Sequence, residues 1–239
     1  MIGVILQPSY IPWRGYFDLI HRADVFVFYD DVQYDKHGWR NRNKIKTSNG
    51  TQWLTIPVSS KGNVEHGLSL ADTRITWTQD WSRKHAMTLR QSYAKAPHFA
   101  EYAAMVEGFY TTRPERLIDF TIETTLALAR ALGITNTRFV RSSELGVTGA
   151  RTERLVRILE KVSATHYISG PSAKDYIEDA VFAEAKIGLE YIVYDYPAYT
   201  QLHPPYDPGV TVLDLMFMTG SEAPEYIWGS KVARAGGAP

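Results

Sequence analysis

Cysteine is absent from this chain of 239 residues. Its absence excludes a disulfide framework, thiolate metal sites and a cysteine nucleophile, and it is compatible with a reducing compartment. Histidines and carboxylates do not stand together at the spacing of metal ligands, so we predict no metal site. Any reaction at a carbonyl must therefore use a nucleophile other than a thiolate, without a resident zinc ion.

The sequence also lacks long apolar runs and an excess of either charge. Lys and Arg together number 26, as do Asp and Glu, so no overall field draws the protein to nucleic acid or to an anionic membrane. No stretch approaches 18 uncharged apolar residues, and the N-terminus carries no basic segment followed by a long apolar one. We predict a cytoplasmic protein without membrane insertion or nucleic-acid binding.

The order of apolar runs predicts an α/β fold. Runs at 2–6 and 25–28 flank a helical segment at 15–23, which is typical of a β-loop-α-β unit with parallel strands. Asn49-Gly50 predicts a hairpin between segments 40–47 and 52–58. After the hairpin, apolar residues recur at the spacing of helices in several segments. The predicted helices are 80–94, 99–110, 114–132, 152–162, 181–185 and 212–218, and the predicted later strands are 139–140, 166–169 and 189–194.

We therefore predict a single α/β domain over residues 1–239, with a Rossmann-like, mostly parallel sheet and a helical insertion at about 74–133. The tail, 230–239, shows no periodicity and is predicted to be disordered. With 44% hydrophobic residues, the chain can bury a substantial core.

The loop after the first strand is the first candidate site, because ligands of open α/β sheets bind at the carboxyl ends of strands. Nucleotide-activating proteins often carry His-x-Gly-His in this place, whereas this chain has Trp13-Arg14-Gly15-Tyr16. The usual nucleotidylyl mechanism is not expected without the two histidines. The glycine and the helix start remain, so Arg14 is a candidate phosphate ligand. Alternatively, the prolines and Gly15 only shape a tight turn over Trp13.

A cationic segment beside Trp39 is the second candidate. On a strand, Arg40, Arg42, Lys44 and Lys46 would share one face. Several cations on one face suit a diphosphate, because Arg can bind two oxygens at once. The alternative is a solvated edge strand whose charges discourage aggregation.

Three residues are candidate acids or bases. Asp30 and Asp31 end an apolar strand, where one can act as a base; equally, they can cap a turn or pair with arginines. His85 lies on a predicted helix, where a structural role is the alternative. The turn Ser169-Gly170 follows another strand and offers donors to an anion or carbonyl. It lacks the Gly-x-Ser-x-Gly pattern of serine hydrolases.

Motifs spread over residues 1–220 together form a pattern that is specific to one family. They are Gln7-Pro8, Gly15-Tyr16-Phe17, Leu19-Ile20, residues 28–32, 38–43 and 53–58, His85, Tyr93, residues 167–170, Tyr199, Gln201 and residues 213–217. In these motifs the chain resembles the WbqC-like family of bacterial proteins. The resemblance implies a role in clusters for O-antigen and other surface polysaccharides, where transfer of glycine or another small acyl group to an amino sugar has been suggested. Two positions depart from the family pattern: Thr211 stands where serine is common, and Met218 where asparagine is common.

Our hypothesis from the sequence is transfer of a small acyl or aminoacyl group to the amine of a nucleotide sugar. The alternatives are an ATP-dependent amide-forming ligase and a non-catalytic sugar-nucleotide or glycan binding protein. The donor is left open: an activated acyl or aminoacyl compound such as an acyl-CoA, a carrier protein, or ATP as activator. The candidate catalytic residues are Asp30, Asp31 and His85. The candidate substrate-binding residues are Gln7, Tyr10, Trp13, Arg14, Tyr16, Trp39, Arg40, Arg42, Asn43, Lys44, Ser169, Gly170 and Gln201.

Overall fold

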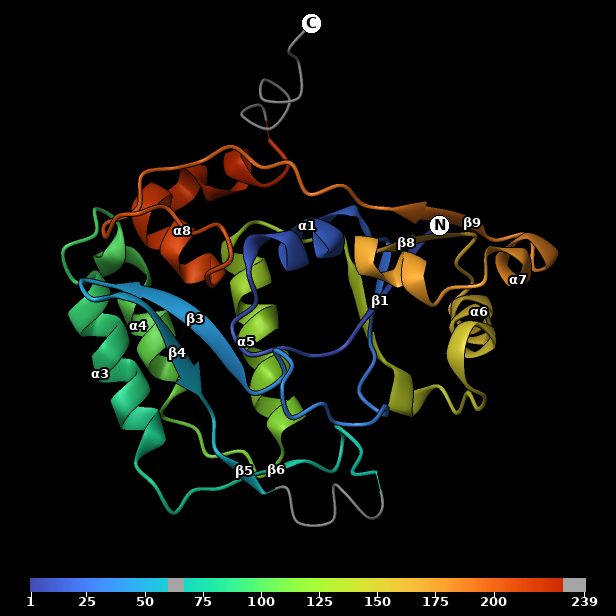
Figure 1. The fold of residues 1–239 in the computed structure, drawn as a ribbon, viewed down its shortest axis with the longest axis horizontal. Coiled ribbons are helices and arrows are strands. Elements are labelled where there is room, and N and C mark those ends of the chain that lie inside the picture. Colours follow the sequence, from blue (N-terminus) through green and yellow to red (C-terminus); the bar gives the residue numbers. More distant parts are fainter. Residues whose placement is uncertain (60–66, 230–239) are drawn as a thin grey trace, which may run out of the picture.

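A five-stranded parallel sheet forms the centre of the computed structural model, which describes residues 1–59 and 67–229 (Figure 1). Its spatial order is β7-β2-β1-β8-β9, and every neighbouring pair is parallel. β2 and β7 thus lie on one side of β1, and β8 and β9 lie on the other, which is the order of a Rossmann-like fold. The strands are β1 (Ile2–Leu6), β2 (Val25–Phe28), β7 (Arg138–Arg141), β8 (His166–Ser169) and β9 (Gly188–Tyr191).

Helices cover both faces of this sheet. Side chains alternate along a strand, so Val4 and Phe26 join the cluster that contains α1, whereas Ile5 and Val25 join the cluster that contains α6. Both faces are buried, which explains why β1 and β2 are apolar throughout rather than alternating. Figure 1 shows α1 and α5 on one side of the sheet and α6 and α7 on the other. These helices are α1 (Arg14–Arg22), α5 (Leu117–Ala131), α6 (Arg151–Lys161) and α7 (Asp179–Glu184).

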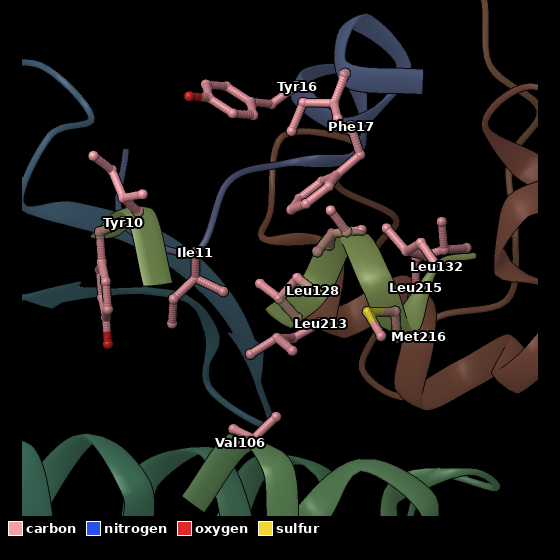
Figure 2. Packing of buried hydrophobic residues seen from close by; sticks show 14 of the residues in the cluster. Tyr10, Ile11, Tyr16, Phe17, Val106, Leu128, Leu132, Leu213, Leu215 and Met216 are labelled. Atoms are coloured by element: carbon pink, nitrogen blue, oxygen red, sulfur yellow. The ribbon is translucent and has the colours of Figure 1, made fainter. Parts of the chain in front are cut away.

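The chain between β2 and β7 adds a hairpin and a helical layer. β3 (Arg42–Thr47) and β4 (Gly50–Thr55) pair in antiparallel fashion, and β5 (Val58–Ser59) pairs with β6 (Arg74–Ile75). Apolar side chains of α5 pack against Leu213 and Met216 of the C-terminal helix α8, beside Ile11 of the first loop (Figure 2). The remaining helices are α3 (Trp81–Tyr93), α4 (Phe99–Phe109), α8 (Val212–Thr219), η1 (Ser142–Glu144), η2 (Pro171–Asp175) and η3 (Gly220–Tyr226).

The structure confirms the predicted α/β class, the parallel sheet and the Asn-Gly hairpin. Several predicted boundaries are wrong by two or three residues, among them those of the hairpin strands, which span 42–47 and 50–55 instead of 40–47 and 52–58. The helix expected from residue 114 begins at Leu117, because Arg116 is still extended. The strand expected over 189–194 ends at Tyr191, which leaves Tyr194 in a loop. The predicted disordered tail, 230–239, lies outside the described residues. In the described part of the chain, no helix combines the length and apolarity needed to cross a membrane.

Candidate functional site

A pocket of about 470 Å³ opens at the carboxyl ends of β1 and β8. The connections that leave these two strands run to opposite faces of the sheet, so their loops diverge and leave a crevice between them. We call this cavity the switch-point pocket. It is lined by Leu6, Gln7, Ser9, Pro12, Trp13, Tyr16, Leu19, Trp39, Arg40, Asn43, Gly170, Pro171, Ser172, Tyr194 and Gly209.

Asn43 of β3 holds the first loop in a strained shape. Ile11 has a φ of 41°, a left-handed conformation that is rare for a β-branched residue. The Asn43 side-chain amide donates to the carbonyls of Tyr10 (3.1 Å) and Ile11 (2.6 Å), and the Tyr10 N–H donates to the Trp39 carbonyl at 3.1 Å. Such conformations persist where surrounding bonds enforce them, often at ligand sites. The hairpin therefore determines the shape of the pocket wall.

Trp13 forms an aromatic wall that depends on Gly15. A Cβ atom on Gly15 would lie 2.4 Å from a ring atom of Trp13, so a larger residue would displace the indole. The Trp13 ring then packs edge-on against Tyr194, with ring centres 4.8 Å apart. Tyr194 follows β9, the outermost strand on that side of the sheet. Residues from opposite ends of the chain thus build one wall.

Arg40 places a cation in this pocket. Its Nη1 donates to the Gln7 carbonyl at 3.1 Å, and the Tyr16 hydroxyl donates to the same oxygen at 3.1 Å. Among described residues Arg40 forms no ion pair, and its buried Nε has no hydrogen-bond partner. Burial lowers the pKa of Arg40, although nearby Tyr16 and Asp35 oppose this, and the guanidinium stays protonated at neutral pH. A partly buried cation without a partner favours an anionic ligand.

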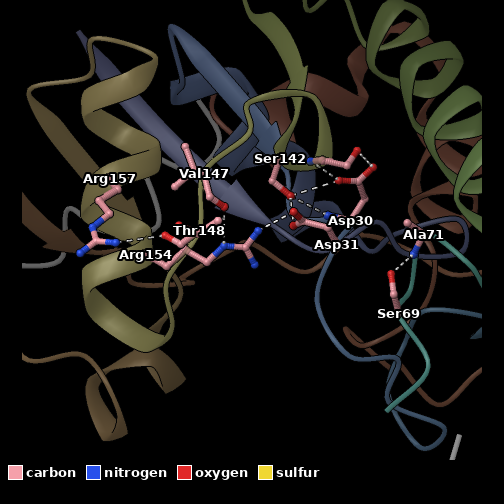
Figure 3. Close-up of polar contacts among 10 residues, drawn as sticks. Asp30, Asp31, Ser69, Ala71, Ser142, Val147, Thr148, Arg154 and Arg157 are labelled. Carbon is pink, nitrogen blue, oxygen red and sulfur yellow. Dashed lines mark hydrogen bonds and ion pairs between the residues drawn. The ribbon is translucent and has the colours of Figure 1, made fainter. Parts of the chain in front are cut away.

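The structure places Asp30 and Asp31 outside the lining of the pocket, in a separate polar cluster (Figure 3). Asp30 accepts hydrogen bonds from Ser142 Oγ (3.1 Å), Ser143 N–H (3.0 Å) and Ser143 Oγ (2.8 Å). Asp31 accepts one from Ser142 Oγ (2.6 Å) and pairs with Arg154. The sheet order explains the location: β2 ends beside β7, on the opposite side of β1 from the pocket. Through these hydrogen bonds, the two carboxylates connect the end of β2 to the end of β7.

His85 lies in the core behind the pocket wall and does not line the pocket. Its Nδ1 lies 2.9 Å from the Tyr10 hydroxyl, which lies 2.6 Å from the Tyr110 hydroxyl. Burial lowers the pKa of His85 to about 4, against a hydrogen bond with the backbone of Thr55 that raises it. The imidazole is therefore neutral at pH 7 and bonded to a buried phenol.

The expectation that four cations share one face is wrong for Arg40, because β3 begins only at Arg42. Arg40 lies before the strand and lines the pocket together with Asn43. Lys46 is buried, and its Nζ donates to the Pro205 carbonyl. Arg42 and Lys44 lie over the ring of Trp53, outside the lining of the pocket. The hairpin therefore does not present a four-cation diphosphate site.

Other predicted ligand-binding residues have partners within the protein. Arg14 donates to the Pro197 carbonyl (2.9 Å) and the Tyr206 hydroxyl (2.8 Å), joining α1 to the loop after β9. Gln201 bonds both backbone groups of Asp207. Ser169 donates to the Tyr167 hydroxyl at 3.2 Å. Of the predicted site residues, the pocket brings together Gln7, Trp13, Tyr16, Trp39, Arg40, Asn43 and Gly170.

The candidate list from the sequence missed several polar and aromatic lining residues. Ser9 and Ser172 belong to loops that the sequence did single out, after the first strand and after 166–169. Tyr194 was assigned to a strand and so was not considered as a loop residue. Gly209 has no sequence signal that we recognise. Within the described ranges, no cluster of three or more His, Asp or Glu side chains is placed to hold a metal ion.

The sheet order and the switch-point pocket define an α/β protein with a Rossmann-like fold. Residues 7–226 match the model of the WbqC-like protein family, so the chain belongs to that family, as the motifs predicted. The chain is 42% identical over 225 residues to "Uncharacterized protein Rv1507c" of Mycobacterium tuberculosis (strain ATCC 25618 / H37Rv), covering 93% of this chain and 96% of that protein. No solved structure matches this chain.

Proposed function

We propose that the protein binds a nucleotide sugar in the switch-point pocket and transfers a small acyl or aminoacyl group to its amine, within surface-polysaccharide synthesis. The observation that carries the proposal is Arg40, a cation without a carboxylate partner among the described residues, in a pocket otherwise lined by uncharged aromatic, aliphatic and polar residues. The pocket lies where sheets of this order bind phosphorylated ligands.

Arg40 would contact a phosphate of the ligand. Its bond to the Gln7 carbonyl orients the guanidinium without neutralising it. A phosphate at the remaining N–H groups would offset the cost of the partly buried charge. Arg14 and Lys46, the buried cations of this region, do not line the pocket. Arg40 is therefore the residue to which we assign phosphate recognition.

The aromatic side chains would contact the base or the sugar. Four rings line the pocket, and Trp39 is 43% exposed, so a face of its indole is open to a ligand. Tyr16 is held by its hydrogen bond to Gln7. Rings fixed in this way lose little freedom when a planar group stacks on them. The rings are Trp13, Tyr16, Trp39 and Tyr194.

Acyl transfer needs hydrogen-bond donors for the carbonyl oxygen of the donor. Gln7, Ser9 and Ser172 line the pocket, and their side chains carry an amide and two hydroxyls that can donate hydrogen bonds. We assign the donor role to these groups. The amine nitrogen would bond to the acyl carbon as the bond between that carbon and the leaving group of the donor breaks, for example the thiolate of an acyl-CoA. The amine proton would pass to water and from there to the departing group, since Asp30, Asp31 and His85 do not line the pocket.

The second candidate function is a sugar-nucleotide binding protein without catalysis. It is favoured by one observation: among the described residues, neither a carboxylate nor an imidazole lines the pocket. A binding protein needs the cation and the rings but no base. The two functions differ only in whether a product forms.

Calorimetric titration with nucleotide amino sugars, ATP and acyl-CoA tests the proposal. Arg40→Gln should weaken nucleotide-sugar binding roughly 10- to 100-fold, since a charged hydrogen bond contributes about 1.5–3 kcal/mol. Arg130→Gln, an exposed position on α5, is the matched control and should bind like the parent. Unchanged affinity in Arg40→Gln would refute the phosphate assignment.

Mass spectrometry then separates the two functions. Incubation with acyl and aminoacyl donors should add the acyl mass to the bound amino sugar if the protein is a transferase. Binding that persists while no donor yields product would favour the binding protein.

A further inference from the structure

Two half-exposed tryptophans extend the wall of the switch-point pocket onto the β3–β4 hairpin. Trp39 is 43% exposed and Trp53 is 41% exposed, and their ring centres lie 5.2 Å apart. Trp39 also lines the pocket, so the pair is continuous with it. Adjacent exposed indoles at the edge of a pocket are typical of a binding surface rather than of scattered surface residues.

Arg42, Lys44 and Lys46 lie on the same face of β3 as Trp53 of β4. Two of these three cations already donate hydrogen bonds within the protein. Arg42 donates to the carbonyls of His37 and Gly38, which holds that turn. Lys46 is buried and donates to the Pro205 carbonyl. Lys44 stands between them and is paired with Trp53 in the strand register.

Lys44 is the cation of this face that is left for a ligand. Its Nζ lies 5.5 Å from the ring centre of Trp53 and 5.9 Å from that of Trp39. In the described part of the chain it makes no ion pair. An ammonium group over aromatic rings keeps its charge available to an anion that approaches along the rings.

We propose that Trp39, Trp53 and Lys44 form a subsite for a sugar ring that carries a carboxylate. The ligand of the pocket would then be a nucleotide amino sugar of the uronic-acid type, an inference that rests on the proposed function. Arg42 and Lys44 lie over the ring of Trp53, so the C–H face of a pyranose would contact Trp39 and the exposed part of Trp53. Lys44 would supply a charge partner for the carboxylate of the sugar. Arg40 is a separate cation on the pocket wall, so phosphate and carboxylate are recognised by different residues.

Titration with matched ligand pairs tests the subsite. UDP-glucosaminuronate and UDP-glucosamine differ only at C6, which is a carboxylate in the first and a hydroxymethyl group in the second, and both carry the amine that the proposed function requires. UDP-galactosaminuronate and UDP-galactosamine form a second pair of the same kind. The wild-type protein should bind the acidic member of a pair about tenfold more tightly. Lys44→Gln should lose this preference while its affinity for the neutral member stays unchanged, and Lys44→Arg should keep the preference. Lys161→Gln, exposed at the end of α6, is the control and should match the wild type.

The outcomes separate this inference from the function on which it rests. Equal wild-type affinities within both pairs, or a Lys44→Gln variant that weakens both members equally, would overturn the carboxylate subsite and leave the pocket as a nucleotide-sugar site. If neither pair binds the wild-type protein, both the subsite and the proposed function are overturned.

Discussion

His85 should make the stability of this protein fall steeply in mild acid. In the folded state burial lowers the pKa of His85 from 6.5 to about 4, with its Nδ1 bonded to the Tyr10 hydroxyl. Between these pH values the unfolded chain binds a proton that the folded chain does not bind. Stability therefore rises with pH in this window: the contribution of His85 is fully present above pH 6.5 and is lost as the pH falls toward 4.

The magnitude follows from the interval between the two pKa values. An interval from 6.5 to about 4 corresponds to roughly 3 kcal/mol, at about 1.4 kcal/mol for each pH unit. At pH 4.5 most of that loss, roughly 2.5 kcal/mol, should already be present. Urea unfolding at pH 7 and pH 4.5 measures it, because the free energy of unfolding extrapolates linearly to zero denaturant.

Comparison with His85→Gln isolates the histidine from the other groups that titrate in this range. The variant should lose roughly 2.5 kcal/mol less than the wild type between the two pH values, whatever its stability at pH 7. His37→Gln changes an exposed imidazole and should leave the wild-type dependence intact. The reasoning fails if His85→Gln and the wild type lose the same free energy, or if the imidazole titrates near pH 6.5 by NMR.

Two further predictions concern Asn43, which positions the pocket, and Asp30, which lies outside its lining. Asn43→Ala should lower the free energy of unfolding by about 1–3 kcal/mol and weaken nucleotide-sugar binding, because it leaves the carbonyls of Tyr10 and Ile11 without their donor. Urea unfolding measures the stability and calorimetry measures the affinity. The control Asn136→Ala, at an exposed position, should change neither. Asp30→Ala should lower the free energy of unfolding by about 3 kcal/mol, through loss of its bonds to Ser142 and Ser143, with unchanged affinity of the folded protein. If the Asp30→Ala variant kept full stability but lost binding, Asp30 would instead belong to the ligand site.

The local elements of the fold were predictable because their signals are short-range. An apolar run stopped by Pro8 predicts β1, and Asn49-Gly50 predicts the β3–β4 hairpin, since both depend on neighbouring residues. The family motifs likewise identified the loops after β1 and β8, which both line the pocket. These signals need no knowledge of strand order.

The side of β1 on which the pocket opens was not predictable in this way. Asp30 and Gln7 both follow strands whose carboxyl ends meet at the same edge of the sheet, as expected from two sequential parallel strands. The crevice nevertheless forms between β1 and β8, whereas Asp30 faces the end of β7. That choice depends on where β7 and β8 add to the sheet after a long insertion, and no local pattern near residue 30 carries this information.

The role of each cation depended on a still finer detail, the residue at which β3 begins. Alternation along a strand places Arg40 with Arg42 only if the strand already exists at residue 40, but the ladder begins with Arg42 opposite Thr55. Before that point Asn41 donates to the Ile56 carbonyl, and Arg40 turns to the Gln7 carbonyl. A difference of two residues in the start of a strand thus separates a pocket cation from cations on an exposed hairpin face. For this reason the test of phosphate binding belongs to Arg40, and a substitution at Arg42 would report on the turn at His37 and Gly38 instead.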